Sequence, residues 1–196
     1  MKKTTLLSVL AAFLFISSTN AQSKKSEVDL GVGVWSSNQI IGVMSDIIAS
    51  VFLPDGVGMS NSSSPGAFHL GYKYSLSDRI AVGPVFIYDL NTSDAVTGNG
   101  KQGKFTSNYS TLSLEGNYNY VNRDKLKLYA LLGAGGTILN QTYKDNQTGN
   151  KHGEKQTFFN FQVTPVGVKY GDSFGAFAEL GFGYKGILSA GLFYRF

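Results

Sequence analysis

Apolar side chains recur at every second position over most of this chain, and this alternation limits the fold more than any other feature. In the stretch from Ile187 to Phe196, for example, Leu188, Leu192 and Phe196 fall on one face. A period of two places successive side chains on opposite faces of a β-strand. The sequence therefore predicts eight strands, at residues 28–35, 68–74, 80–88, 112–121, 126–134, about 157–170, 174–184 and 187–196.

The lengths of these runs and of the segments between them favour a barrel that crosses a membrane. Runs of about ten residues match a tilted strand that spans a hydrocarbon core. Tight turns, at 75–78, 122–124 and 171–173, alternate with long connections, at 36–66, 90–104 and 140–156. Only the connection at Lys185-Gly186 breaks this order by being short. A sheet in lipid must close on itself, because no water satisfies its edges.

We therefore predict an all-β fold, an eight-stranded antiparallel up-and-down transmembrane β-barrel. The alternative is a soluble lipocalin-like barrel, whose apolar face would point inward and hold a ligand. Aromatic residues near the strand ends favour the membrane, because they form the two interfacial girdles of such barrels. We expect the girdle aromatics to be Tyr74, Tyr118, Tyr120, Phe174, Tyr194 and Phe196 at the short-turn rim, and Phe68, Tyr88 and Tyr184 toward the other rim.

The sixth run changes its parity. Phe159, Phe161 and Val163 favour one face, whereas Val166 and Val168 favour the other. The shift falls at Thr164-Pro165, and proline cannot donate to a strand ladder. A β-bulge explains the shift, and a misplaced strand boundary is the alternative.

The N-terminal residues have the features of an export signal. Lys2 and Lys3 precede an apolar run from Leu6 to Ile16, and small residues follow up to Ala21. We expect a signal peptide over residues 1–21, cleaved after Ala21, and a barrel domain over 22–196. An N-terminal anchor helix is the alternative, but the apolar run is too short to span a bilayer.

Charge and cysteine content exclude several classes of protein. Without the signal, 17 − 2 = 15 basic residues stand against 13 acidic ones, and they form no dense basic face for nucleic acid. The chain has no cysteine, so we expect no disulfide scaffold, no lipid-anchored lipoprotein and no cysteine-type metal site.

The eight runs, the segment "FQVTPVGVKYGDSFGAFAELGFGY" and the final "GLFYRF" together resemble a known family. The chain is similar in plan to the small OmpA and OmpX barrels, and more so to the outer membrane protein beta-barrel domain proteins of Bacteroidetes-type bacteria. The resemblance implies a monomer in the outer membrane of a Gram-negative bacterium, in contact with outer-membrane lipid and lipopolysaccharide. It also implies recognition by the barrel-assembly machinery through the last strand, at Leu188, Ala190, Leu192, Tyr194 and Phe196.

Six charged residues fall on the face opposite the apolar stripe, which is the lumen of the predicted barrel: Asp29, Lys73, Glu115, Lys127, Glu179 and Arg195. Isolated buried charges are costly, so we expect them to pair. Our hypothesis is that Glu115 and Glu179 share basic partners drawn from Lys73, Lys127 and Arg195. Such a network would be a structural plug or the gate of a narrow pore.

The first long connection contains a helical pattern in "NQIIGVMSDIIASVF", residues 38–52. Its apolar positions follow helical spacing: Ile40, Ile41, Met44, Ile47, Ile48, Val51 and Phe52. We predict a short amphipathic helix that Asn38 caps and Pro54 ends. It would lie in the membrane interface, cover the barrel mouth, or pack on its own loop.

The inventory of reactive side chains is short. His69 and His152 are the only histidines, and neither has a neighbouring nucleophile and acid in a catalytic spacing. We therefore predict no catalytic, cofactor or metal site. The polar connections "NTSDAVTGNGKQGK" and "NQTYKDNQTGNKHGEK" suit surface contact, adhesion or shielding. The leading interpretation is an outer-membrane protein with a structural or surface-interaction role; a narrow channel and a lipid-modifying enzyme are the alternatives.

Overall fold

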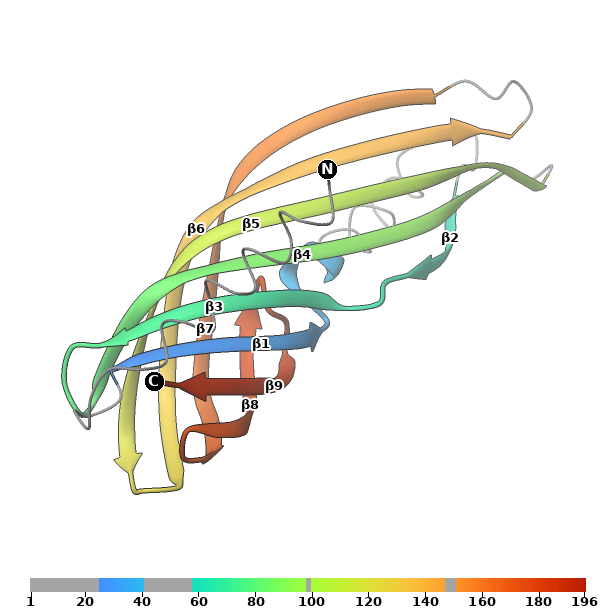
Figure 1. Ribbon diagram of the computed structural model, residues 1–196. Helices are drawn as coiled ribbons and strands as arrows, with labels where there is room; N and C mark the ends of the chain where they lie inside the picture. Colours follow the sequence, from blue (N-terminus) through green and yellow to red (C-terminus); the bar gives the residue numbers. More distant parts are fainter. Residues whose placement is uncertain (1–24, 41–57, 98–99, 147–150) are drawn as a thin grey trace, which may run out of the picture.

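The structure, a computed structural model, describes residues 25–40, 58–97, 100–146 and 151–196. These residues form nine β-strands (Figure 1). They are β1 (Ser26–Val34), β2 (Gly58–Ser63), β3 (Ala67–Ser75), β4 (Ile80–Thr97), β5 (Gly100–Asn122), β6 (Leu126–Asp145), β7 (Lys151–Gly171), β8 (Phe174–Gly183) and β9 (Leu188–Arg195).

Eight of these strands form a closed antiparallel ring. The order is β1-β3-β4-β5-β6-β7-β8-β9, and β9 pairs back with β1. Closure satisfies every strand of the ring on both sides, as lipid requires. The predicted eight-stranded barrel is confirmed. β2 lies outside the ring and pairs with β4; its sequence, GMSNSS, has no apolar alternation and was not predicted as a strand.

The apolar face of the ring points outward. Leu30, Leu112 and Leu132 are 60–65% exposed, whereas the inward residues His69 and Glu115 are 1% exposed. Leucine on the exterior and charge in the interior is the reverse of a soluble barrel. This orientation decides against a lipocalin-like fold.

The predicted bulge in β7 is confirmed. Thr164 and Gly167 face Leu131 and Tyr129 of β6, so two residues of β7 oppose one of β6. The pairing with β8 slips between Val163 and Val166. The extra residue reverses the parity, so that Lys169 points inward and is buried.

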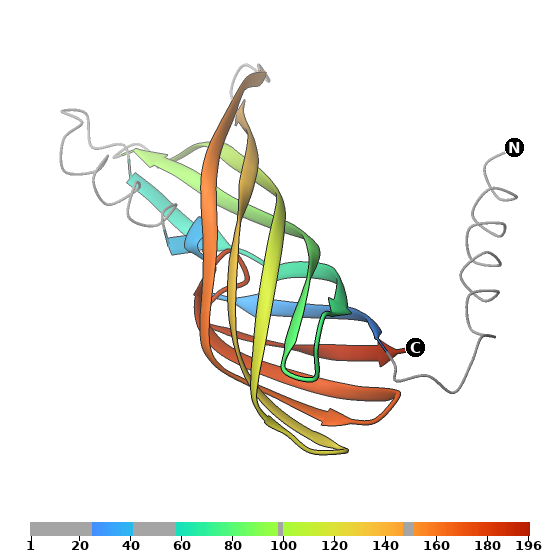
Figure 2. The same cartoon turned by 90° about the vertical axis from the view of Figure 1, so that its left-hand side faces the viewer.

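The wall of the barrel has two unequal halves. Strands β1, β3, β8 and β9 have 8 to 10 residues, whereas β4, β5, β6 and β7 have 18 to 23. Figure 2 shows the long strands rising well past the short ones. Much of the predicted loops 90–104 and 140–156 is therefore strand. Their Asn, Thr, Ser and Lys residues resemble a loop in composition, but they pair across β4–β5 and β6–β7.

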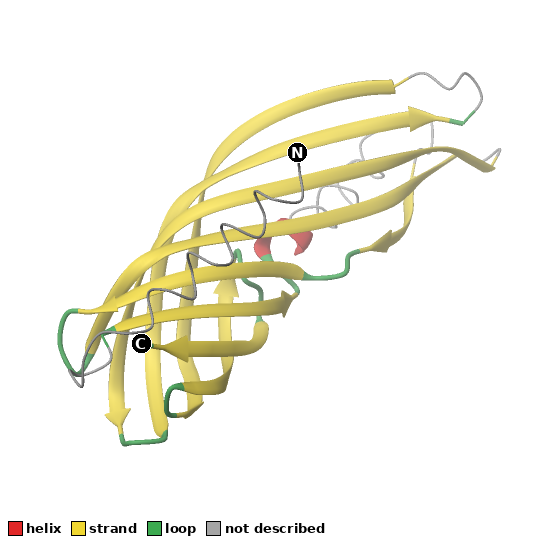
Figure 3. Ribbon diagram, viewed as in Figure 1, coloured by secondary structure: helices red, strands yellow, loops and turns green. Residues whose placement is uncertain are grey.

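The predicted helix begins just after β1, at residues 37–40 (Figure 3, red). The prediction that Asn38 caps it is wrong. Ser36 is the cap: its Oγ accepts from the Gln39 amide at 3.2 Å, and the Ser36 amide donates to the Gln39 side chain at 3.3 Å. This reciprocal pair is a capping box. The remaining predicted helix positions, Ile41, Met44, Ile47, Ile48, Val51 and Phe52, lie outside the described residues.

The predicted signal peptide, residues 1–21, also lies outside the described residues. Among those that are described, no helix has the length and apolarity needed to cross a bilayer.

Candidate functional site

The lumen holds five charged side chains in one chain of ion pairs, which we call the central ion network: Asp29, Lys73, Glu115, Lys185 and Glu179. Lys73 Nζ lies 2.9 Å from Asp29 and 3.1 Å from Glu115. Lys185 Nζ lies 2.9 Å from Glu115 and 3.3 Å from Glu179. All five side chains are buried. The network therefore links β1, β3, β5 and β8 across the lumen.

Neutral donors complete the coordination of the two glutamates. Tyr129 donates its hydroxyl hydrogen to Glu179 at 2.7 Å, and Ser189 donates to it at 3.1 Å. Tyr184 donates to Glu115 at 3.1 Å. Buried carboxylates with several donors and a cation are well compensated for their lost hydration.

A second group, the short-turn ion cluster, lies nearer the tight turns and consists of Glu27, Lys169 and Arg195. Glu27 accepts from Lys169 Nζ through one carboxylate oxygen and from Arg195 Nε, at 2.7 Å, through the other. Arg195 also stacks on the Phe193 ring, 4.1 Å from its centroid. Together the two groups contain four carboxylates and four cations, so their formal charges cancel.

The connection between β8 and β9 folds into the barrel and supplies Lys185. We call residues 184–187 the strap. Gly183 and Gly186 adopt positive φ angles of 141° and 107°, which L side chains rarely adopt. The Tyr184 amide bonds to the Phe161 carbonyl at 3.1 Å, and the Ile187 amide bonds to the Val34 carbonyl at 3.0 Å. The strap is thereby fixed to β7 and β1.

Two lumen glycines make room for the strap. A Cβ at Gly33 would lie 1.7 Å from the Lys185 carbonyl oxygen, and one at Gly133 would lie 2.0 Å from the Tyr184 hydroxyl. Any side chain at these positions would displace the strap. The prediction that Tyr184 faces lipid is wrong, because the chain turns inward at Gly183 and buries it completely.

The structure brings together five of the six predicted lumen charges, although not all in the predicted pairs. Glu115 pairs with Lys73 as proposed, but the partner that Glu115 and Glu179 share is Lys185. Arg195 pairs with Glu27. Lys127 is only partly buried and forms no ion pair with any described residue. It lines a pocket of about 20 Å³ at the short-turn end, which is room for about one water molecule.

A third polar group, the mouth cluster, lies where the helical turn meets the wall. Its members are Ser36, Ser37, Asn38, Gln39, Ser64, Asp89, Thr137 and Asn160. Buried Asp89 accepts from Ser64 at 3.2 Å and from Gln39 at 3.3 Å, and Ser36 also donates to it. Asn160 bonds to Ser37, Asn38 and Thr137, each at 3.1 Å. The cluster ties the helical turn to β4 and β7.

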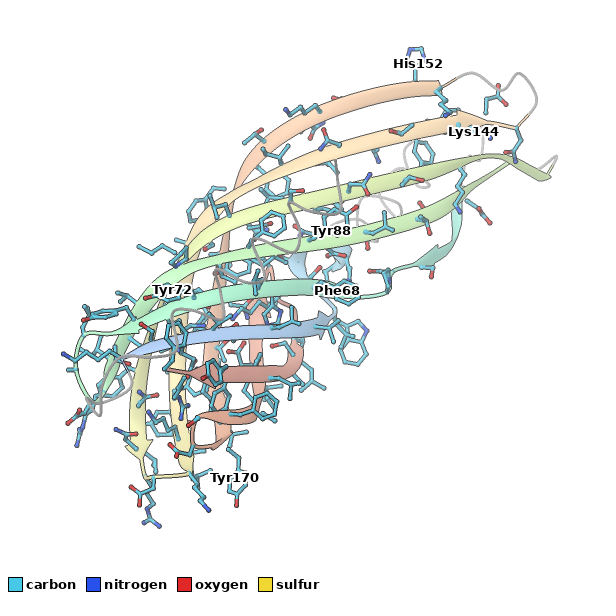
Figure 4. The ribbon with its side chains drawn as sticks, viewed as in Figure 1. Phe68, Tyr72, Tyr88, Lys144, His152 and Tyr170 are labelled. Carbon is cyan, nitrogen blue, oxygen red and sulfur yellow. The ribbon has the colours of Figure 1, made fainter. Side chains whose placement is uncertain are left out.

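The histidines do not form a recognisable catalytic arrangement. Both ring nitrogens of buried His69 are without a hydrogen-bond partner among the described residues, and the ring lies 5.9 Å from that of Phe177. A catalytic base needs a partner that orients its ring. His152 is exposed near the far end of β7 (Figure 4). In the described part of the chain, no three His, Cys, Asp or Glu side chains are grouped so as to hold a metal ion.

The outer surface carries the predicted aromatic positions. Phe68 and Tyr88 lie on adjacent strands toward the long-strand end (Figure 4), and both are exposed, as are Tyr74, Tyr118, Tyr120, Phe174 and Tyr194. Trp35, predicted to face inward, is exposed because β1 ends at Val34 and the backbone turns at Trp35, with φ of 57°. In β9, Leu188, Ala190, Leu192 and Tyr194 form an exposed outward stripe, and Phe196 is partly exposed.

A closed ring with an apolar exterior and a neutralised, ion-paired lumen is the plan of an outer-membrane barrel. The model of the family described as "Outer membrane protein beta-barrel domain" matches residues 7–192. The chain belongs to this family. It is an outer-membrane protein, so the tight turns face the periplasm and the long strands face outward from the cell.

Solved structures of one protein resemble this barrel. They are two structures of Ail, the attachment invasion locus protein of Yersinia pestis, one of them in complex with the heparin analogue sucrose octasulfate. Both are 14% identical and cover 88% of this chain and 99% of the Ail chain, with TM-scores of 0.44 and 0.43. At these values the likeness supports no inference about ligands. No curated protein sequence matches this chain.

Proposed function

We propose that this protein is a non-catalytic surface protein, in which a sealed barrel anchors a raised sheet for contacts outside the cell. One observation carries the proposal: β4 to β7 continue far past the sealed barrel and leave one sheet edge open. β7 pairs with β8 only from Gln162 to Gly171, so residues 151–160 pair with β6 alone among the described residues.

The two edges of the raised sheet differ. On the β4 side, the chain covers its own edge with β2, which pairs with residues 92–96. On the β7 side, no described strand does so. An unpaired edge is a template for an added strand, and β-strand addition is a common mode of peptide recognition. We therefore place the contact surface on the outer half of β7.

The lumen supports the role of an anchor in preference to the alternative of a channel. The central ion network and the strap fill the cross-section with paired, buried side chains. We expect the purified protein to give no steady conductance in planar bilayers. Steady conductance that is lost in Glu115→Gln or Glu179→Gln would instead favour a narrow channel.

Photo-crosslinking on intact cells tests the contact surface. A photoreactive amino acid replaces Gln156 on the open edge, and the same amino acid replaces Lys125 in a periplasmic turn as the matched control. We expect crosslinks to extracellular proteins from position 156 and none from position 125. Equal crosslinking at both positions, or none at position 156, would refute the surface role.

The export and assembly roles remain proposals too: cleavage after Ala21, and recognition of the last strand by the barrel-assembly machinery. Outward Leu188, Ala190, Leu192, Tyr194 and Phe196 support the second. Deletion of Phe196 should lower the amount of protein in the outer membrane more than it lowers the stability of the folded barrel. Normal outer-membrane levels of the truncated protein, measured by immunoblot, would contradict this role.

A further inference from the structure

Three lysines stand side by side on the raised sheet, and we call them the lysine row. Lys104 of β5 is directly opposite Lys144 of β6, and Lys144 is directly opposite Lys151 of β7. All three are exposed. Residues that are directly opposite on antiparallel strands have Cβ atoms about 5 Å apart, and like charges in such pairs are destabilising.

The lysine row faces the membrane side of the sheet. Counting down β7 by twos from Lys151, the same face passes through Lys155 and Thr157 to the exposed rings of Phe159 and Phe161. On β6 it passes from Lys144 through Asn140 to Ile138. The row therefore continues the lipid-facing stripe upward, past the level where the apolar residues end.

The height of the lysines matches a headgroup layer. A strand rises about 3.3 Å per residue, and barrel strands tilt by about 40°. Lys155 then stands about 10 Å above Phe159, and the row stands about 20 Å above it. Thr106, Thr142, Asn108 and Asn140 occupy the same face between the apolar stripe and the row, and they offer hydrogen bonds to sugar hydroxyls.

Protection of the sheet edge does not explain the row. Lysine on an exposed edge strand discourages unwanted pairing, and this would account for Lys151 and Lys155 of β7. It does not account for Lys104 and Lys144, because β5 and β6 are interior strands with partners on both sides. Asp94 of β4 is opposite Lys104, so the excess of positive charge lies toward β6 and β7.

We propose that the lysine row binds the phosphate groups of lipopolysaccharide, the phosphorylated glycolipid that surrounds the barrel in the outer leaflet. Phosphate oxygens between neighbouring ammonium groups remove the repulsion along the row. The site lies on the broad face of the sheet and does not depend on the open edge of β7.

Binding of purified lipopolysaccharide tests the site. The full-length protein in detergent micelles is titrated with fluorescently labelled lipopolysaccharide that keeps its lipid A and inner-core phosphates. The test variant combines Lys104→Gln, Lys144→Gln and Lys151→Gln. The control combines Arg79→Gln, Arg123→Gln and Lys125→Gln, which removes the same charge from the periplasmic turns. Heat-modifiable gel mobility shows that each variant is folded.

We expect each single lysine change to weaken binding about two- to fivefold, and the triple variant to weaken it about 10- to 100-fold. The control should stay within about twofold of the wild type. Enzymatically dephosphorylated lipopolysaccharide should bind the wild type as weakly as the intact lipid binds the triple variant. Equal losses in the two triple variants, or unchanged binding after dephosphorylation, would overturn the proposal. A lysine-dependent response to inorganic phosphate with no such response to lipopolysaccharide would overturn it as well.

Discussion

The central ion network and the mouth cluster are both buried and polar, but they are built in different ways. The network joins strands around the ring through charged pairs, such as Lys185 with Glu115 and Glu179. The mouth cluster joins one helical turn to the wall mainly through neutral donors, which surround Asp89 and Asn160. Separating buried charges costs far more than exchanging neutral hydrogen bonds for water. The difference indicates a rigid barrel beneath a mouth that opens more readily.

Loss of Lys185 should have the largest effect on this comparison. In Lys185→Met, Glu179 has no cation within 4 Å among the described residues, and Glu115 retains only Lys73. We expect the free energy of unfolding to fall by about 3–5 kcal/mol, because an uncompensated charge stays buried. Guanidinium titration in detergent micelles, followed by gel mobility, measures the change.

Lys127 provides the matched control, since it is also a lumen lysine but has no ion pair with a described residue. Lys127→Gln should change the free energy of unfolding by less than about 0.5 kcal/mol. A similar loss in Lys127→Gln and Lys185→Met would mean that lumen charge as such, and not pairing, stabilises the barrel.

Asn160→Ala should have a smaller effect than Lys185→Met. It removes the hydrogen bonds to Ser37, Asn38 and Thr137 and leaves neutral groups, which cost about 1–3 kcal/mol when they lose their partners. The same titration measures it, with exposed Asn146→Ala as the control. A loss as large as that of Lys185→Met would erase the distinction between mouth and barrel.

Alternation was sufficient to predict the ring, because the parity of a strand fixes which face meets lipid. It also placed Asp29, Lys73, Glu115 and Glu179 in the lumen. Lys169 was missed because the bulge at Thr164-Pro165 reverses the parity of β7 after the point where it was assigned.

The strap was beyond the reach of a strand pattern. Tyr184 continues the alternation of β8, and only the left-handed backbone at Gly183 turns it and Lys185 inward. Glu27 was missed as the first residue of its run. The height of the long strands was missed because their outer halves are polar on both faces, as water on both sides allows, and such strands resemble loops in composition.

The pairing of β1 with β9 also has a consequence in time. Glu27 and Arg195 meet across this seam although 168 positions separate them in the chain, and Ser26 and Phe196 exchange backbone hydrogen bonds there. Contacts of such long range form slowly, since the whole intervening chain must first be arranged. Until the seam forms, the outer edges of β1 and β9 face the bilayer without partners, which a hydrocarbon environment penalises heavily. Seam formation is therefore the step that we expect to limit the rate of folding.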